Sequence, residues 1–420
     1  MEVDIQIPDT WDQVAFKPDT NLSPRDYFDE MAPIFCTTEI PFECIGEHMK
    51  AYAQSHNLSQ SPRTLLVGGL RAKKLLLFSP LLKWYIEQGL LVTSIYEVIE
   101  FSKQSCFSDF VNFITKARRD GDLDKTKEII GILCKLLGNS AFGGTIMDKS
   151  KFLHVKYLSG SRQAAFAVND PRFLRLNELS DEIYETEFYR RSIRMDLPVQ
   201  IGFAILQYAK LFLLKFYYSF LIKSVGFQNF EHLETDTDSS YIALASETLE
   251  GSILPEMKAE FQSSLLDHCN DNYVLTEDSW FARTCCKKHN QFDSRTPGIM
   301  KEEWRGNKMI CLCSKSYVAV CQQEGTIKFS LKGVNKRNFV DPTCTFEKVL
   351  RTQETQMSIN RGIRLRGNTL FTYEQSKKAF TYFYCKRRVL NDGIHTRCLD
   401  LTLKPKKRKR NDTEFVGDDI

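Results

Sequence analysis

The spacing of hydrophobic residues alternates between a strand period and a helix period along the chain. Alternation in EVDIQIP, residues 2–8, and in VTSIYEVIEF, residues 92–101, predicts strands. LLVGGL and LLLFSP predict short buried segments, and SPLLKWYIEQG predicts a helix that Ser79 opens and Gly89 closes. Residues 104–137 predict two helices around the turn RRDGDLD. KFLHVKYL, AAFAV, RFLRLNEL and IYETEFYRRSI predict a β-rich segment over 150–190, whereas residues 1–60 beyond the first strand are loop-rich.

The longest apolar stretch, residues 201–222, is long enough to span a bilayer, which takes about 20 residues. It contains Gln207, Lys210 and Lys215, and a central lysine costs about 2.5–3.5 kcal/mol on insertion. We therefore expect a buried helix over 197–223 and no membrane segment. Beyond it, EHLE and YIALA predict two strands around a turn, and NKMICLCSKSYVAV, residues 307–320, predicts a hairpin.

Composition and charge narrow the class of protein. The 420 residues are 42% hydrophobic and 26% charged, which excludes a wholly disordered or fibrous chain and leaves room for two or three domains. The net charge of +4 hides an asymmetry: residues 301–420 hold 25 Lys and Arg against 13 Asp and Glu, whereas residues 1–300 hold 32 against 40. A basic C-terminal part predicts a polyanionic partner there.

The 13 cysteines form no CxxC pair, and the sequence MEVDIQIPDT has no secretory pattern. The nearest groupings are His268 with Cys269, Cys285–Cys286 with His289, and Cys311 with Cys313. These spacings do not match the two ligand pairs of a structural zinc site. We interpret the cysteines as reduced thiols of an intracellular protein.

A carboxylate pair stands out in TDTDSS, residues 235–240. Asp236 and Asp238 are two apart in an extended segment, so a tight turn between paired strands can aim both at one point. Two such groups suit Mg²⁺, which binds a few carboxylates together with substrate phosphates. The alternative is a polar hairpin turn, because Asp, Thr and Ser are ordinary turn residues.

A second feature is KLLGNSAFG, residues 135–143. Lys135 and Asn139 are four apart and share a helical face, with Lys127 eight residues earlier and Arg118 and Arg119 on the preceding element. Such a face can bind a triphosphate, Phe142 can stack on a base, and Gly143 permits close backbone approach. The alternative is an amphipathic helix with solvated lysines.

Together these segments resemble family B DNA polymerases of the protein-primed branch. KLLGNSAFG is similar to their motif B, KxxxNSxYG, and Asp236–Ser239 to motif C, DTDS. Lys315-Ser316-Tyr317 resembles the KxY primer-terminus motif; PGIMKEEWRGNKMI precedes it and LKGVNKR follows. The run from IGEHM to CLDL resembles the polymerases of Polinton/Maverick-type mobile elements or their viral relatives. Glu234 stands where the family often has an aromatic residue, and Phe142 replaces tyrosine.

The resemblance implies an α+β palm–fingers–thumb fold that lacks the exonuclease domain and the motif A strand. It implies a first terminal-protein-region-like insertion over 1–62 and a second over 147–196. The remaining expected parts are palm over 63–103, fingers over 104–146, palm with motif C and the KxY hairpin over 197–325, thumb over 326–400, and a disordered tail over 401–420.

The resemblance also implies template-directed DNA synthesis, with primer–template DNA, dNTPs and a terminal protein primer as partners. Asp236 and Asp238 would hold two Mg²⁺ ions, with Mn²⁺ as a substitute, and Lys135, Asn139, Phe142, Gly143, Lys127 and Arg118 would bind the nucleotide. Lys315 and Tyr317, on one face of a strand, would contact the primer. The DNA phosphates would be contacted by Lys328, Lys332, Lys336 and Arg337. The tail KPKKRKR predicts nuclear localisation through Lys404, Lys406, Lys407, Arg408, Lys409 and Arg410.

One element of the family is absent from these 420 residues, because no DxxSLYP string of motif A occurs. By order, residue 1 falls after motif A, and Asp4 in the first strand is the nearest substitute carboxylate. The alternative function is therefore a catalytically inactive remnant that binds primer–template DNA without extending it. A two-metal nuclease is a third hypothesis, which leaves KLLGNSAFG and the KxY segment without a role.

Overall fold

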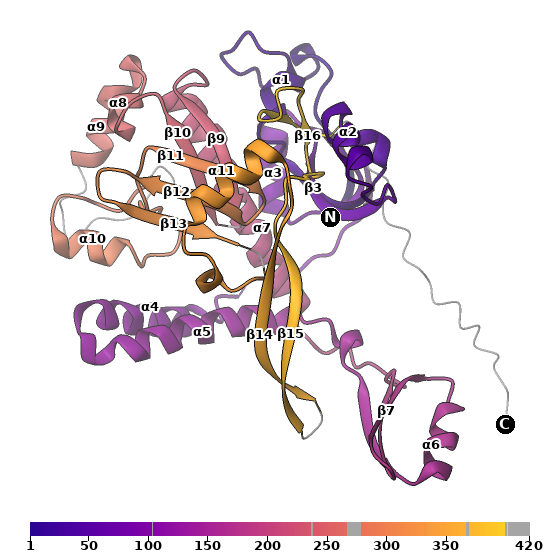
Figure 1. The fold of residues 1–420 in the computed structure, drawn as a ribbon. Helices are drawn as coiled ribbons and strands as arrows, with labels where there is room; N and C mark the ends of the chain where they lie inside the picture. Colours follow the sequence, from indigo (N-terminus) through magenta and orange to yellow (C-terminus); the bar gives the residue numbers. More distant parts are fainter. Residues whose placement is uncertain are drawn as a thin grey trace.

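The computed structural model of the chain has an α+β fold and describes residues 1–102, 104–236, 238–266, 279–331, 333–366, 369–399 and 401. Lys332 and the basic tail from residue 402 lie outside the described residues. Figure 1 shows a main body of mixed helices and sheets, from which a helical hairpin, a long β-hairpin and a small lobe project. The α+β class expected from the sequence is confirmed.

The first strand is the centre of a small sheet. β1 (Glu2–Gln6) pairs antiparallel with β4 (Arg71–Leu76) on one side and β5 (Leu91–Glu97) on the other. Next to it, β2 (Ile34–Ile40) pairs with β3 (Arg63–Gly69). Residues 1–62 thus share their sheets with residues 63–103.

The expectation of loops before residue 60 is wrong. This segment contains α1 (Pro24–Asp29) and α2 (Glu47–Ser55) as well as β2. Ser23 caps α1, because its hydroxyl accepts the backbone N–H of Asp26, and a proline follows at the first helical position. The helix α3 (Ser79–Glu87) is confirmed, although Phe78, not Ser79, occupies its N-cap position.

A long helix organises the first hydrophobic core. α7 (Val199–Lys215) continues without a break into the π-helix η5 (Phe216–Val225). Tyr217, Leu221 and Val225 are at most 1% exposed and pack in one cluster with β1 and α3. The first half of the helix exposes Ile205 and Tyr208, so the expected buried helix is buried mainly in its second half. In the described part of the chain, Val199–Val225 alone is long and apolar enough to cross a membrane, by length and composition only.

The two helices expected over 104–137 are α4 (Ser108–Leu123) and α5 (Glu128–Thr145). RRDGDLD is not their turn, because α4 runs through it to Leu123 and the chain reverses at η3 (Lys125–Lys127). The two helices approach closely near this reversal: a Cβ added to Gly121 would lie 3.3 Å from the Cα of Gly131. Glycine at both positions lets the backbones come together.

The β-rich segment forms the small lobe at the lower right of Figure 1. Its sheet has the order β6–β8–β7, from β6 (His154–Ser159), β7 (Phe173–Ser180) and β8 (Ile183–Phe188). AAFAV is not a strand but lies in α6 (Ser161–Val168). Gly160 has φ +83°, which ends β6 and lets the chain turn into that helix.

The C-terminal half contains several hairpins, a three-stranded sheet and a second core. β14 and β15 form the long hairpin in the lower centre of Figure 1. The second core joins α2 and α11 to the sheet β11–β12–β13 through Met49, Phe346 and Val318. The elements are β9 (Phe230–Asp236), β10 (Ser239–Leu244), α8 (Leu249–Ser252), α9 (Lys258–Leu266), α10 (Lys287–Asp293), β11 (Lys308–Cys313), β12 (Ser316–Cys321), β13 (Thr326–Ser330), α11 (Pro342–Thr352), β14 (Gln356–Arg366), β15 (Thr369–Phe380), β16 (Arg388–Val389) and β17 (Thr396–Arg397).

His232 makes the stability of this fold depend on pH. Burial, followed by the positive charge of Arg387, lowers the pKa of His232 from 6.5 to about 4. Its Nε2 lies 2.9 Å from the hydroxyl of Thr235. Between these two pKa values the unfolded chain binds a proton that the folded chain excludes, so stability falls as the pH falls. Because His232 keeps some exposure to solvent, we expect a loss of about 1–3 kcal/mol.

The test is urea unfolding of the native chain and of His232→Gln at about pH 7 and about pH 4.5. The variant should lose less stability across this interval than the native chain. His154→Gln, a substitution of an exposed histidine on β6, is the control and should retain the native pH dependence. An equal loss in the native chain and in His232→Gln would contradict the assignment.

Candidate functional site

The TDTDSS segment is the end of an antiparallel hairpin. β9 and β10 pair with Asp236 opposite Ser239 and Glu234 opposite Tyr241. The backbone N–H of Asp238 donates to the carbonyl of Asp236 at 2.7 Å, which closes the turn. The two strands expected around this turn are therefore confirmed, and both carboxylates lie at the hairpin tip. Thr237 lies outside the described residues.

Lys315 joins this tip to the neighbouring sheet. Its ammonium Nζ lies 2.8 Å from Oδ1 of Asp236, although the two residues are 79 positions apart. The hydrogen bond to Asp236, followed by the charge of that carboxylate, raises the pKa of Lys315. Lys315 has φ +64° and lies in the turn between β11 and β12, so the expectation that it alternates with Tyr317 along a strand is wrong. A tight turn needs this left-handed backbone, which a strand excludes.

Glu234 is a site residue that the sequence analysis did not assign. Its carboxylate accepts the backbone N–H of Lys315 at 2.7 Å. Burial raises the pKa of Glu234, whereas this hydrogen bond acts in the opposite direction. The signal in the sequence was the spacing of Glu234 and Asp236, which places both on one face of β9. The spacing does not reveal that this face of β9 contacts Lys315, which the structure shows.

Two tyrosines pack against each other beside the contact of Lys315 with Asp236 and Glu234. The hydroxyls of Tyr241 and Tyr317 lie 2.7 Å apart, and their ring centroids are separated by 4.8 Å. Lys328 places its ammonium 5.5 Å from the Tyr241 ring and 3.6 Å from Glu303. Tyr317 is 8% exposed, so it supports the site from within rather than offering its ring to a ligand.

The motif B residues lie on the helical hairpin. Lys135 and Asn139 are exposed on α5, Phe142 is half-buried, and a Cβ at Gly143 would meet no atom within 4 Å. Lys127 does not share their helical face, because it lies in η3 before α5 begins and pairs with Asp124 at 3.6 Å. Asp124 accepts the backbone N–H of Thr126, and this cap breaks the helix there.

The arginines on α4 face the main body. Burial, followed by the positive charge of Arg295, lowers the pKa of Arg118. Arg119 donates to the backbone carbonyl of Phe292 and to the hydroxyl of Thr296. Because Arg119 has these partners, it anchors α4 to the segment around α10.

The other predicted site residues that the structure describes interact with groups near them in the fold. Lys336 donates to the carbonyl of Phe329 at 2.6 Å, and Arg337 is exposed on the 3₁₀ helix η8 (Lys336–Asn338). Asp4 accepts the backbone N–H of Lys74 at 2.8 Å and the hydroxyl of Tyr96 at 2.9 Å. Both carboxylate oxygens of Asp4 therefore have donors from its own sheet.

The donor chemistry at the hairpin tip fits a divalent cation. Asp236 and Asp238 offer hard oxygen atoms, which Mg²⁺ and Mn²⁺ prefer, and the Lys315 ammonium already lies against one of them as a positive charge. A cation bound at Asp236 would compete with Lys315. No protein-family model, curated protein or solved structure shows a significant match to the chain.

Removing the Lys315 ammonium should strengthen cation binding. In Lys315→Gln we expect Mn²⁺ affinity to rise by up to about fivefold, because a partly exposed ion pair contributes up to about 1 kcal/mol and no longer competes. Asp236→Asn should weaken binding. The measurement is a Mn²⁺ titration followed by electron paramagnetic resonance.

Lys308→Gln is the matched control, since Lys308 is an exposed lysine on the adjacent strand β11 and pairs with Glu347 instead. Its Mn²⁺ affinity should equal that of the native chain. Unchanged or weaker binding in Lys315→Gln would show that Lys315 does not compete with the cation.

Proposed function

We propose that the chain carries part of the active site of a DNA-directed DNA polymerase of the protein-primed family B type. The observation that supports this proposal is the contact between Asp236, in the segment similar to motif C, and Lys315, in the segment similar to KxY. In a polymerase, the groups that hold the metal and those that hold the primer end must lie together, because reacting atoms must be positioned in line.

The proposed reaction transfers a nucleotide from a dNTP to the primer 3′-hydroxyl. Divalent cations held by Asp236 and Asp238 would make the hydroxyl a better nucleophile and stabilise charge on the triphosphate. Lys315 places a positive charge beside these carboxylates, where a primer phosphate can pair with it once Asp236 is engaged elsewhere. Tyr241 and Tyr317 hold the turn of Lys315 against the hairpin.

The exposed face of α5 supplies the second part of the proposal. Lys135 is free to approach incoming phosphates, and Asn139 lies one turn further along the same face. Phe142 and Gly143 follow at the end of the helix, where a flat ring and an open backbone suit a base pair. The long hairpin β14–β15 carries Lys377 and Lys378, which suit contacts with phosphates.

A second function, binding of primer–template DNA without extension, is favoured by the surroundings of Asp4. Two-metal transfer needs carboxylates that converge on both ions, and both oxygens of Asp4 already accept hydrogen bonds. If Asp4 does not bind a metal ion, Asp236 and Asp238 are the predicted carboxylate ligands that remain. The same basic surfaces would hold the DNA in either case.

Primer extension and a gel shift on one primer–template separate these functions. The native chain should extend the primer with Mg²⁺ or Mn²⁺, and Asp238→Asn should reduce extension by at least about 100-fold while it still shifts the DNA. Lys135→Ala should lower the rate of primer extension and raise the KM for the dNTP. Lys83→Ala, on the exposed face of α3, is the control and should change neither result.

Binding without extension by the native chain would select the second function. If the Asp238→Asn variant extends the primer as well as the native chain does, Asp238 is not part of the active site. A chain that neither binds nor extends the DNA, although it unfolds cooperatively on heating, would contradict both functions.

A further inference from the structure

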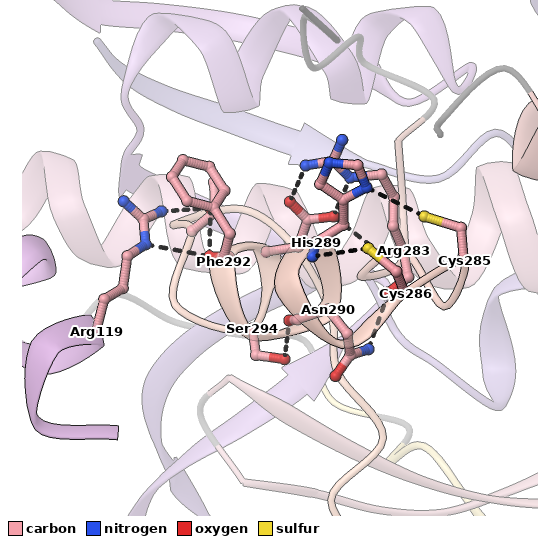
Figure 2. Close-up of polar contacts among 10 residues, drawn as sticks. Arg119, Arg283, Cys285, Cys286, His289, Asn290, Phe292 and Ser294 are labelled. Atoms are coloured by element: carbon pink, nitrogen blue, oxygen red, sulfur yellow. Dashed lines mark hydrogen bonds and ion pairs between the residues drawn. The ribbon is translucent and has the colours of Figure 1, made fainter. Parts of the chain in front are cut away.

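Two cysteines and a histidine converge just before and within α10. The chain bends at Cys285, and Cys286 follows at the N-cap position of the helix. His289 lies three residues later, so the first helical turn returns it to the same side (Figure 2). The ligand atoms of these three residues all lie within 4.8 Å of one another, and Cys285 Sγ lies 3.2 Å from His289 Nδ1.

We propose that Cys285, Cys286 and His289 supply three ligands of a zinc-binding site. Thiolate sulfur and imidazole nitrogen are the ligands that Zn²⁺ prefers. With Zn–S bonds of about 2.3 Å and Zn–N bonds of about 2.0 Å, neighbouring tetrahedral ligands lie about 3.5–3.8 Å apart. The observed separations, 3.2 Å for one pair and at most 4.8 Å for the others, can reach this geometry through side-chain adjustments. The inference does not depend on the proposed polymerase function.

The structure explains why spacing alone did not predict this site. Adjacent cysteines point to opposite sides of a straight strand, and they converge here only because of the bend at Cys285. A structural zinc site usually draws its ligands from two separated pairs, whereas this cluster comes from one short segment. The other grouping, His268 with Cys269, lies outside the described residues.

A buried ion pair fixes the loop that carries the ligands. Arg283 and Asp293 are 7% and 3% exposed, and the guanidinium donates to both carboxylate oxygens at 2.7 and 2.9 Å. The backbone N–H of Arg283 also donates to Asp293, and Asn290 donates to the carbonyl of Arg283. Arg283, at the start of the loop, is thus tied to α10 through Asp293 and Asn290, which limits the movement of the segment that carries the two cysteines.

Zinc binding at this site would release protons. When the two thiols and neutral His289 bind one Zn²⁺, up to two protons are released to solvent, so the affinity should rise with pH.

The metal loop also borders the helical hairpin. Figure 2 shows Arg119 beside Phe292, and its guanidinium lies 3.6 Å from the centre of that ring. Arg295 pairs with Asp122 at 2.5 Å. Arg119 and Asp122 belong to α4, whereas Phe292 and Arg295 lie at the end of α10 and just beyond it. Zinc bound at the start of α10 would therefore stabilise the contact that holds α4.

The first experiment uses the full chain, stripped of metal with a chelator and titrated with Zn²⁺ and with Co²⁺. One equivalent should bind, and Co²⁺ should give the thiolate charge-transfer and visible bands of a tetrahedral site. Cys285→Ser/Cys286→Ser should lower the affinity by more than about 100-fold, since loss of an outer-shell partner alone costs about 10–100-fold. Cys344→Ser, which removes an exposed thiol on α11, is the matched control and should bind normally.

A rescue variant separates metal binding from folding. His289→Ala should lose tight binding, whereas His289→Cys should retain it with a stronger charge-transfer band, because a third thiolate replaces the imidazole. Hydrogen exchange in α4 should slow when Zn²⁺ is added to the native chain but not when it is added to the double serine variant. No tight binding by the native chain, or unchanged binding by the double serine variant, would overturn the proposal.

Discussion

The contact of Lys315 with Asp236 and Glu234 is the interaction on which the candidate site depends. It joins two hairpins that are far apart in the sequence, through one ion pair of 2.8 Å and one backbone hydrogen bond of 2.7 Å. The ion pair is partly exposed and contributes little to stability by itself. The backbone hydrogen bond to Glu234 contributes more, because burial of the acceptor shields it from competing water. Together they fix where the two hairpins meet, and Tyr241 and Tyr317 fill the space beside them.

Much of the local structure could be predicted from the sequence, because period and turn residues determine it. The strands around Asp236, the hairpin around Lys315 and the long helix through Tyr217 all have strong periodic patterns. The helix that contains AAFAV was missed, since a short apolar run fits either period and the deciding feature was the turn at Gly160.

The arrangement of the site could be predicted only in part. The sequence singled out Asp236, Asp238, Lys315 and Tyr317 as functional candidates, and the structure brings Asp236 and Lys315 into contact. It did not predict the role of Glu234, whose partner is a backbone N–H that no motif specifies. Neither did it predict that Tyr317 is buried, because that depends on where the sheet β11–β12–β13 meets the hairpin β9–β10. Such facts arise from long-range packing rather than from local propensity.

The glycine contact between α4 and α5 has a mechanical consequence. Gly121 and Gly131 hold the two backbones together near the turn, and Arg119 and Asp122 bind the segment around α10. At the opposite end of α5, Gly202 of α7 leaves room for Thr145 and Ile146, since a Cβ there would overlap both. The hairpin of α4 and α5 is thus held by contacts at its tip and at its base. Any movement that separates its tip from α10 has to break the Arg295–Asp122 pair and the hydrogen bonds of Arg119 to Phe292 and Thr296.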